Sequence, residues 1–318
     1  MSFYILTSMY IVWYYFINMD CKKKRDKDLK IPFKKLVLLG IGALAAGVIL
    51  VLANKQEAPK YEHNIVFLGD SVIGNYAQFF SVTTVMEDRL GVDVYNGALG
   101  GTCMSFYVGN VRESVHSSQW SMVKLAQAIY AEDWTSQVAG VSYSENYRES
   151  AGQILDYFYE RILHLSQTDF SKVDILIMEH GTNDYNCGQV LESEEDPWDI
   201  TTYAGAIRTT VKLLTEKYPD LRIILVSPIY CEFIDEDNAK CYETDFGGGV
   251  LDDYVQMQKT VAEECGVEWI NAYHGSGIWS DTIDIYTYDK LHLTDEGKQL
   301  IGDLIADYLE ENPSKPVQ

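Results

Sequence analysis

From residue 64 onward, short apolar segments alternate with segments of helical periodicity, and this alternation strongly limits the possible folds. Short, continuously apolar segments are typical of strands that are buried on both faces. Strands that alternate with helices form a mostly parallel sheet with helices on both of its faces. The expected strands are 64–68, 92–95, 173–178, 222–226 and 267–270, and the expected helices are about 75–90, 119–131, 146–165, 199–217, 250–265 and 295–311.

Residues 63–318 contain no internal repeat, no long linker and no change of composition, so we expect them to form one domain. The 318-residue chain is 47% apolar and 23% charged, an ordinary globular composition that excludes collagen-like and wholly disordered classes. No CxxC pair is present, and a structural zinc site is therefore not expected.

The N-terminal region has the pattern of a membrane-targeting segment. Residues 1–35 are apolar and then basic, with eight Lys and Arg between Lys22 and Lys35. The uncharged residues 36–53 just reach the length that spans a bilayer, and the basic block favours a cytoplasmic start. We expect 36–53 to be a transmembrane anchor, followed by a linker at 54–62. A signal peptide cleaved after Ala53 is the alternative.

Residues 1–18 leave two readings open: a second spanning segment, or sequence upstream of a true start at Met19. With either reading, the domain after residue 53 is expected outside the cytoplasmic membrane.

Charge is distributed unevenly along the chain. Residues 1–53 hold eight Lys and Arg against three Asp, whereas the remainder holds 17 basic against 44 acidic residues. A surface this acidic repels phosphate backbones, so nucleic acid is not an expected partner.

Polar motifs follow the ends of the expected strands, where ligands bind in parallel sheets. GDSV at 69–72 follows the first strand, NGALGGT at 96–102 the second and HGTND at 180–184 the third, and DKLH at 289–292 precedes the last helix. Together they supply a hydroxyl nucleophile, a base with a nearby carboxylate, a glycine amide and a carboxamide. Those are the groups that acyl transfer requires.

In this order, the four motifs resemble the SGNH, or GDSL-type, hydrolase family, and the resemblance covers roughly residues 64–311. It implies a three-layer α/β/α, flavodoxin-like fold. It also implies a catalytic triad of Ser71, Asp289 and His292, and an oxyanion hole formed by Ser71, Gly101 and Asn183. Neither a cofactor nor a metal ion is implied.

The second motif matches the family least tightly, because Gly97 and Gly100 lie close to Gly101. In GDSV, Val72 stands where leucine is commonest in the family.

The residue types fit these roles on chemical grounds. A serine hydroxyl is a poor nucleophile until a neutral imidazole removes its proton. Asp289 lies one turn before His292, so its carboxylate can fix the imidazole tautomer. Backbone amides and the Asn183 carboxamide can then stabilise the negative charge that develops on the substrate.

Several alternatives remain at this point. Ser71 can simply cap a helix, and His274 is a rival base without an upstream carboxylate. His180 can line the site or only pack. Cys231 and Cys241 flank a polar loop, and they are either free thiols or a disulfide in an oxidising compartment.

We expect a serine esterase that removes an acyl group, most simply acetyl, from a carbohydrate or another cell-surface polymer. The acyl group and the polymer follow from the resemblance and the topology, not from individual residues. The alternative is a lipolytic esterase or thioesterase, similar to a lysophospholipase, at the membrane surface. A non-catalytic binding module on the same fold is a third class.

Overall fold

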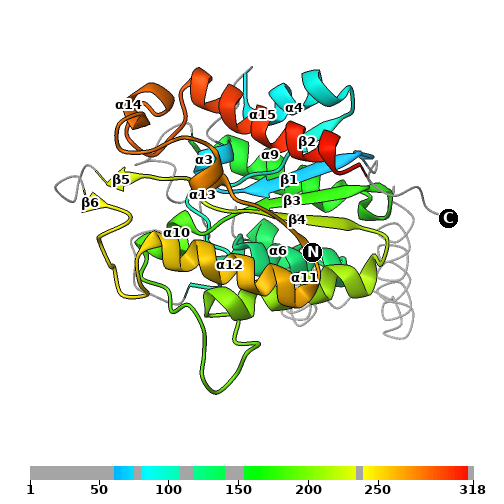
Figure 1. Cartoon of the computed structure of the whole chain (residues 1–318). Helices are drawn as coiled ribbons and strands as arrows, with labels where there is room; N and C mark the ends of the chain where they lie inside the picture. The colour runs from blue at the N-terminus through cyan, green and yellow to red at the C-terminus, as the bar shows by residue number, and fades with distance from the viewer. Residues whose placement is uncertain (1–60, 75–79, 108–117, 140–153, 234–238, 314–318) are drawn as a thin grey trace, which may run out of the picture. The chain divides into compact units, whose positions relative to one another are not determined.

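The chain divides into two compact units, Met1–Ala58 and Pro59–Gln318. The computed structural model describes residues 61–74, 80–107, 118–139, 154–233 and 239–313, all within the second unit, and describes no side chains for 154–157 (Figure 1). The expected anchor or signal segment at 36–53 and the alternatives for 1–18 lie outside these residues. Within the described residues, no helix has the length and hydropathy needed to span a bilayer.

Five parallel strands form the central sheet, in the order β2-β1-β3-β4-β7. They correspond to the five expected strands, and the order is the flavodoxin-like 2-1-3-4-5 when only these strands are counted. All residues of the central strands β1 and β3 are buried, which explains their continuous apolar character. Their bounds are β1 (Ile65–Gly69), β2 (Val94–Asn96), β3 (Ile175–Glu179), β4 (Arg222–Val226) and β7 (Glu268–Ile270).

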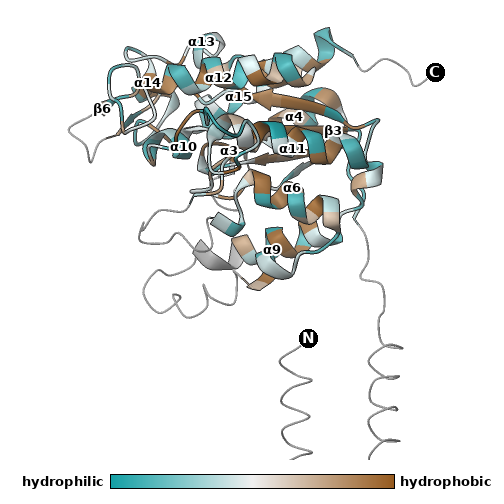
Figure 2. Ribbon diagram, turned by 90° about the horizontal axis from the view of Figure 1, so that it is seen from below, coloured by the Kyte–Doolittle hydropathy of each residue, from teal (hydrophilic) through white to brown (hydrophobic). Residues whose placement is uncertain are grey.

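Helices cover both faces of the sheet and complete three layers. The helices α4 (Val82–Leu90) and α15 (Asp295–Glu311) pack together on one face, and α6 (Met122–Ala131), α11 (Tyr203–Lys217) and α12 (Leu251–Cys265) on the other (Figure 1). Gly302 permits the close approach of α15 to α4, because an added Cβ would lie 2.6 Å from the Val85 side chain. The strands are mostly hydrophobic, whereas the helices carry both hydrophobic and hydrophilic residues (Figure 2).

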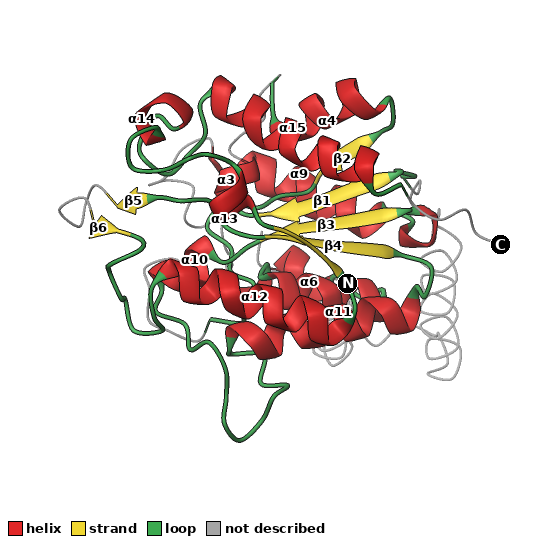
Figure 3. Ribbon diagram, in the orientation of Figure 1, coloured by secondary structure: helices red, strands yellow, loops and turns green. Residues whose placement is uncertain are grey.

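Shorter helices and strands lie in the connections between these main elements (Figure 3). They are the helices α3 (Ser71–Gly74), α10 (Thr182–Asn186), α13 (Ala272–Gly275) and α14 (Ile283–Tyr286), the 3₁₀ helix η1 (Phe170–Lys172), and an antiparallel pair of strands, β5 (Glu232–Phe233) and β6 (Ala239–Lys240). The helix α9 (Ile154–Gln167) precedes η1.

The first expected helix, 75–90, is wrong in its start. Its apolar periodicity continues across Ser81, but the Ser81 hydroxyl accepts a hydrogen bond from the Thr84 amide (3.2 Å) while the Ser81 amide donates to Thr84 Oγ1 (2.9 Å). This reciprocal capping box starts α4 at Val82. Residues 71–74 form the separate helix α3, and 75–79 lie outside the described residues.

Candidate active site

Ser71 is the first residue of α3 and follows β1 after a single residue, Asp70. The Asp70 carboxylate accepts a hydrogen bond from the Val72 amide (2.8 Å), and its backbone carbonyl accepts one from the Gly74 amide (3.0 Å). These bonds turn the chain directly from strand to helix. They leave the Ser71 side chain partly exposed at the carboxyl end of the sheet.

The structure brings Ser71, His292 and Asp289 into one hydrogen-bonded series. His292 Nε2 lies 3.0 Å from Ser71 Oγ, and His292 Nδ1 lies 2.6 Å from Asp289 Oδ2. An ionised carboxylate only accepts hydrogen bonds, so Nδ1 carries the proton and Nε2 is free to accept the serine hydroxyl proton.

Asp289 also organises the loop that carries His292. Its Oδ1 accepts hydrogen bonds from the amides of His292 (2.7 Å) and Leu291 (3.1 Å). Burial raises the pKa of Asp289, but hydrogen bonds from the His292 ring and from these amides outweigh burial and hold the pKa below its usual value. The carboxylate is therefore ionised at neutral pH, as the tautomer of His292 requires.

Asn183 lies in the first turn of α10, after β3. Its Nδ2 donates to Asp70 Oδ2 (2.9 Å) and to the Thr102 carbonyl (3.2 Å). The carboxamide is thus tied both to the residue before Ser71 and to the loop after β2. Because both of its hydrogens have protein acceptors, one must leave Thr102 before Asn183 can donate to a substrate.

Two of the three glycines of the second motif have different structural roles. An added Cβ at Gly97 would lie 2.7 Å from the Leu68 side chain, so Gly97 serves the packing of the sheet. Gly101 is exposed, has φ of 75°, and has open space where a Cβ would stand. Glycine is therefore favoured at this position by the left-handed backbone conformation, not by a lack of space for a side chain.

Sequence reasoning assigned no role to the buried carboxyl groups within these motifs, Asp70 and Asp184. Asp184 accepts hydrogen bonds from the amides of Met104 (2.7 Å) and Ser105 (3.0 Å) and from the Ser105 hydroxyl (2.5 Å), which anchors the loop after Gly101. Burial raises the pKa of Asp184 to about 6 and that of Asp70 to about 7. For Asp70, a charged residue directly after an apolar strand is a sequence signal, but Asp184 lies inside α10 and has no such signal.

The alternative histidines occupy other positions. His274 is exposed on α13 and its Nε2 lies 2.9 Å from Asp252 Oδ1, so it does have a carboxylate partner, although one from α12. His292, not His274, accepts the hydrogen bond of the Ser71 hydroxyl. His180 is buried, which lowers its pKa to about 3, and it packs behind the site with Nε2 3.4 Å from Thr102 Oγ1.

Cys231 and Cys241 are both buried and both free thiols in this structure. They lie opposite each other at the base of the β5–β6 pair, with the Cys231 amide 3.4 Å from Cys241 Sγ.

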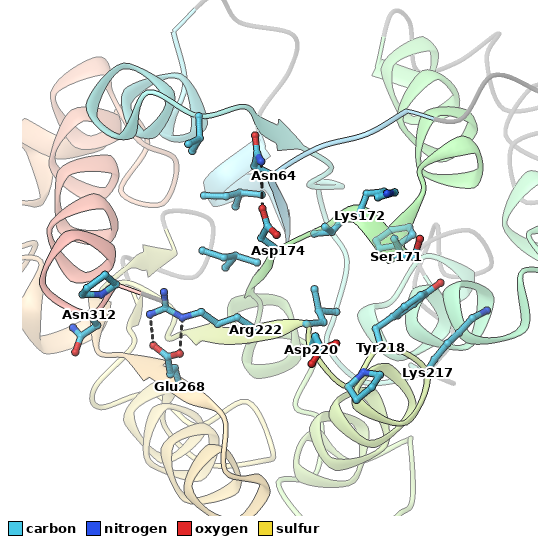
Figure 4. Close-up of a pocket in the computed structure, with 18 residues that line it drawn as sticks. Asn64, Ser171, Lys172, Asp174, Lys217, Tyr218, Asp220, Arg222, Glu268 and Asn312 are labelled. Carbon is cyan, nitrogen blue, oxygen red and sulfur yellow. Dashed lines mark hydrogen bonds and ion pairs between the residues drawn. The ribbon is translucent and has the colours of Figure 1, made fainter. Parts of the chain in front are cut away.

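A hollow of about 1050 Å³ lies at the opposite, amino end of the strands (Figure 4). Its lining includes Asn64 before β1, Asp174 before β3 and Arg222 at the start of β4. Arg222 and Glu268 form a double hydrogen bond across it, with both distances 2.6 Å. None of the motif residues lines this hollow.

Comparison with known proteins agrees with the fold. A protein from Lactobacillus plantarum of known structure has a TM-score of 0.54 and 16% identity, over 79% of this chain and 98% of its own. A possible lipase from Chitinophaga pinensis (TM-score 0.49, 17% identity, 79% and 98% covered) and Est24, a carbohydrate acetylesterase from Sinorhizobium meliloti (0.45, 18%, 79% and 99%), are also similar. No curated protein sequence matches the chain.

Residues 67–300 match the sequence profile of the GDSL-like Lipase/Acylhydrolase family. This match covers most of the chain and includes all four motifs that lie at the carboxyl end of the sheet. The chain therefore belongs to the GDSL-like lipase/acylhydrolase, or SGNH hydrolase, family and is an ester hydrolase.

Proposed function

We propose that the chain hydrolyses acyl esters through a covalent intermediate on Ser71. The observation that carries this proposal is the unbroken hydrogen-bonded series from Ser71 through His292 to Asp289. Such a series activates a hydroxyl that is otherwise unreactive at neutral pH.

The three groups divide the steps of this mechanism among them. Ser71 Oγ attacks the ester carbonyl while His292 Nε2 takes the hydroxyl proton, and Asp289 stabilises the imidazolium that results. His292 then gives that proton to the leaving alcohol as the ester C–O bond breaks. A water molecule attacks the acyl-serine while His292 takes its proton, and His292 returns this proton to Ser71 Oγ as the acyl–Ser71 bond breaks and the carboxylic acid leaves.

The negative charge of the tetrahedral intermediate needs donors placed in advance. The Ser71 and Gly101 amides and Asn183 Nδ2 are the proposed donors. Asn183 keeps its hydrogen bond to Asp70 and donates its second hydrogen bond to the substrate oxygen in place of the Thr102 carbonyl.

For the substrate, we propose a short acyl ester, most simply acetyl, on a carbohydrate or another cell-surface polymer. Exposed aromatic rings support this proposal. Tyr288 is 60% exposed and stacks on the His292 ring with centroids 5.8 Å apart, and Tyr242 and Trp279 are partly exposed and stacked on each other. Solvent-exposed aromatic rings can stack on a ring-shaped, partly apolar ligand such as a sugar.

The test is hydrolysis of p-nitrophenyl esters from acetate to palmitate, together with acetylated xylan and peptidoglycan, by the full-length chain. Ser71→Ala is expected to abolish hydrolysis, because Ser71 is the hydroxyl that His292 contacts. Retention of more than about 1% of the activity would rule out the nucleophile, since removal of a triad member leaves only residual catalysis. Preference for palmitate over acetate would favour the lipolytic alternative.

We also propose that the domain lies outside the cytoplasmic membrane, tethered by residues 36–53. The basic block before this uncharged run supports the orientation. Protease treatment of intact protoplasts tests it. Loss of the domain while a cytoplasmic marker survives is expected, and full protection of the domain would contradict the topology.

A further inference from the structure

The short hairpin formed by β5 and β6 contacts the catalytic loop at Lys290. The Glu232 amide donates to the Lys290 carbonyl (2.9 Å), and Lys290 Nζ donates to Glu232 Oε2 (2.9 Å). The other carboxylate oxygen, Oε1, accepts a hydrogen bond from the Tyr230 hydroxyl (2.8 Å). Glu232 therefore holds Lys290 by both its backbone and its side chain.

Lys290 stands between Asp289 and His292 and has an unusual backbone conformation. Its φ is 63°, in the left-handed region that a residue with a Cβ adopts only at a cost of about 1–2 kcal/mol. A loop that contains such a residue needs contacts from outside to hold it. The hydrogen bonds of Asp289 lie within the loop, whereas those of Glu232 fasten it to a different part of the fold.

The two carboxylates near Lys290 differ in burial. The Glu232 side chain is only 5% exposed, whereas Asp284, 3.5 Å from Lys290 Nζ, is 79% exposed. Water and salt weaken an exposed pair, but a largely buried, charge-assisted hydrogen bond keeps its strength. Glu232 is thus the partner that fixes the lysine.

We propose that Glu232 is a positioning residue, which acts through Lys290 to hold Asp289 and His292 in line with Ser71. This inference rests on the proposed function, because it assumes that these three residues carry out the hydrolysis. Glu232 contacts neither Ser71 nor His292 in the structure, so its loss should reduce turnover and leave substrate binding nearly unchanged.

The chain offers a matched control at the other end of the sheet. Glu268 also pairs with a basic residue, Arg222 (2.6 Å), and also accepts a hydrogen bond from a tyrosine, Tyr308 (3.1 Å). It lies at the start of β7, in the hollow at the amino ends of the strands (Figure 4). Glu268→Gln removes the same charge from the same kind of contact, although at a more exposed position (35% against 5%), away from the loop at 289–292.

The experiment compares kcat and KM for p-nitrophenyl acetate in the full-length chain and its variants. Glu232→Gln is expected to lower kcat about tenfold, equivalent to ~1.4 kcal/mol in activation free energy, with KM changed by less than about twofold. Glu268→Gln is expected to leave kcat within about twofold of wild type, even where urea unfolding shows that both variants lose stability.

Lys290 supplies the second arm, because it is partly exposed and its substitution spares the core. Lys290→Met should lower kcat as much as Glu232→Gln, and Lys290→Arg should retain most of the rate because it keeps the ion pair. The double variant Glu232→Gln/Lys290→Met should be no slower than either single variant, since each substitution removes the same contact between Lys290 and Glu232.

Equal kcat values for Glu232→Gln and Glu268→Gln, or additive losses in the double variant, would overturn the positioning role. Failure of the proposed function is seen separately, as an inactive wild type or an active Ser71→Ala variant.

Discussion

Asp70→Asn removes a negative charge next to Ser71 without changing the size of the side chain. The Asp70 carboxylate is fully buried and accepts hydrogen bonds from the Val72 amide (2.8 Å) and from Asn183 Nδ2 (2.9 Å). An asparagine offers only one oxygen, so its NH₂ group must face one of these two donors. One of the two hydrogen bonds is therefore lost. Either the Asn183 carboxamide loses its acceptor, or the turn at Ser71 loses the acceptor for the Val72 amide.

The variant should therefore be a slower enzyme. Misplacing one oxyanion donor is expected to lower kcat by about 10-fold to 100-fold, or ~1.4 to ~2.7 kcal/mol, somewhat less than removing the donor. KM should change little if the interaction is made mainly in the transition state.

The same substitution should change how stability depends on pH. Burial raises the pKa of Asp70 from 3.8 to about 7, so between these values the folded protein holds a proton that the unfolded chain has released. The free energy of unfolding therefore falls as pH rises through this window, by about 1.4 kcal/mol per pH unit and about 4 kcal/mol in total. Asparagine does not titrate in this range, so the variant does not show this fall in the free energy of unfolding.

Urea unfolding at about pH 5 and about pH 8 measures the difference, and p-nitrophenyl acetate hydrolysis at about pH 8 measures kcat. Relative to wild type, Asp70→Asn should gain stability as pH rises. The control is Asp245→Asn, because hydrogen bonds from the Gly247 and Gly249 amides lower the pKa of Asp245. Asp245 is therefore ionised in both the folded and the unfolded chain across this pH range, and Asp245→Asn should not alter the change in stability above about pH 5.

An unchanged pH dependence of unfolding in Asp70→Asn would refute the assignment of this proton to Asp70. An unchanged kcat would refute the link from Asp70 to Asn183.

Further substitutions separate the roles of the remaining residues. Asn183→Ala should lower kcat by about 10²–10³ with little change in KM, and a raised KM at constant kcat would instead make Asn183 a binding residue. His292→Ala should abolish ester hydrolysis and His274→Ala should not, and the opposite result would reassign the base. Leu68→Ala, at a fully buried position of β1, should reduce the free energy of unfolding by about 2–5 kcal/mol in urea, and a change below about 1 kcal/mol would contradict its place in the core.

The order of strands and helices was predictable because the central strands are buried on both faces. In the strand Ile175–Glu179, the first four residues are continuously apolar, and they stand out from the amphipathic helices around them. The start of α4 was not predicted, since the apolar spacing continues across Ser81 and only the capping interaction ends it. Local hydrogen bonding decided that boundary against the periodicity.

The candidate site was predictable to the extent that its residues lie in short motifs at the ends of strands. Ser71, Asn183 and the pair Asp289 and His292 each adjoin a regular element whose position the apolar pattern indicates. The contacts that hold them are different. Lys290 and Glu232 are 58 residues apart, and Asp184 and the Ser105 amide are 79 apart, with no pattern in the sequence that joins them.

The part of the site near Ser71 and the part near His292 are held by carboxyl groups in different surroundings. At the ends of β1 and β3, Asp70 and Glu179 are both fully buried, and burial raises the pKa of each, so these carboxyl groups reduce stability at neutral pH. An apolar residue at position 70 would remove that cost, but it would also remove the acceptor that fixes Asn183. Near His292, by contrast, the charged contact is the pair of Lys290 and Glu232. Lys290 remains partly hydrated, so it is not fully desolvated when it pairs with Glu232. Loss of charge at Asp70 should therefore raise stability at high pH while it lowers kcat, whereas loss of charge at Glu232 should lower both.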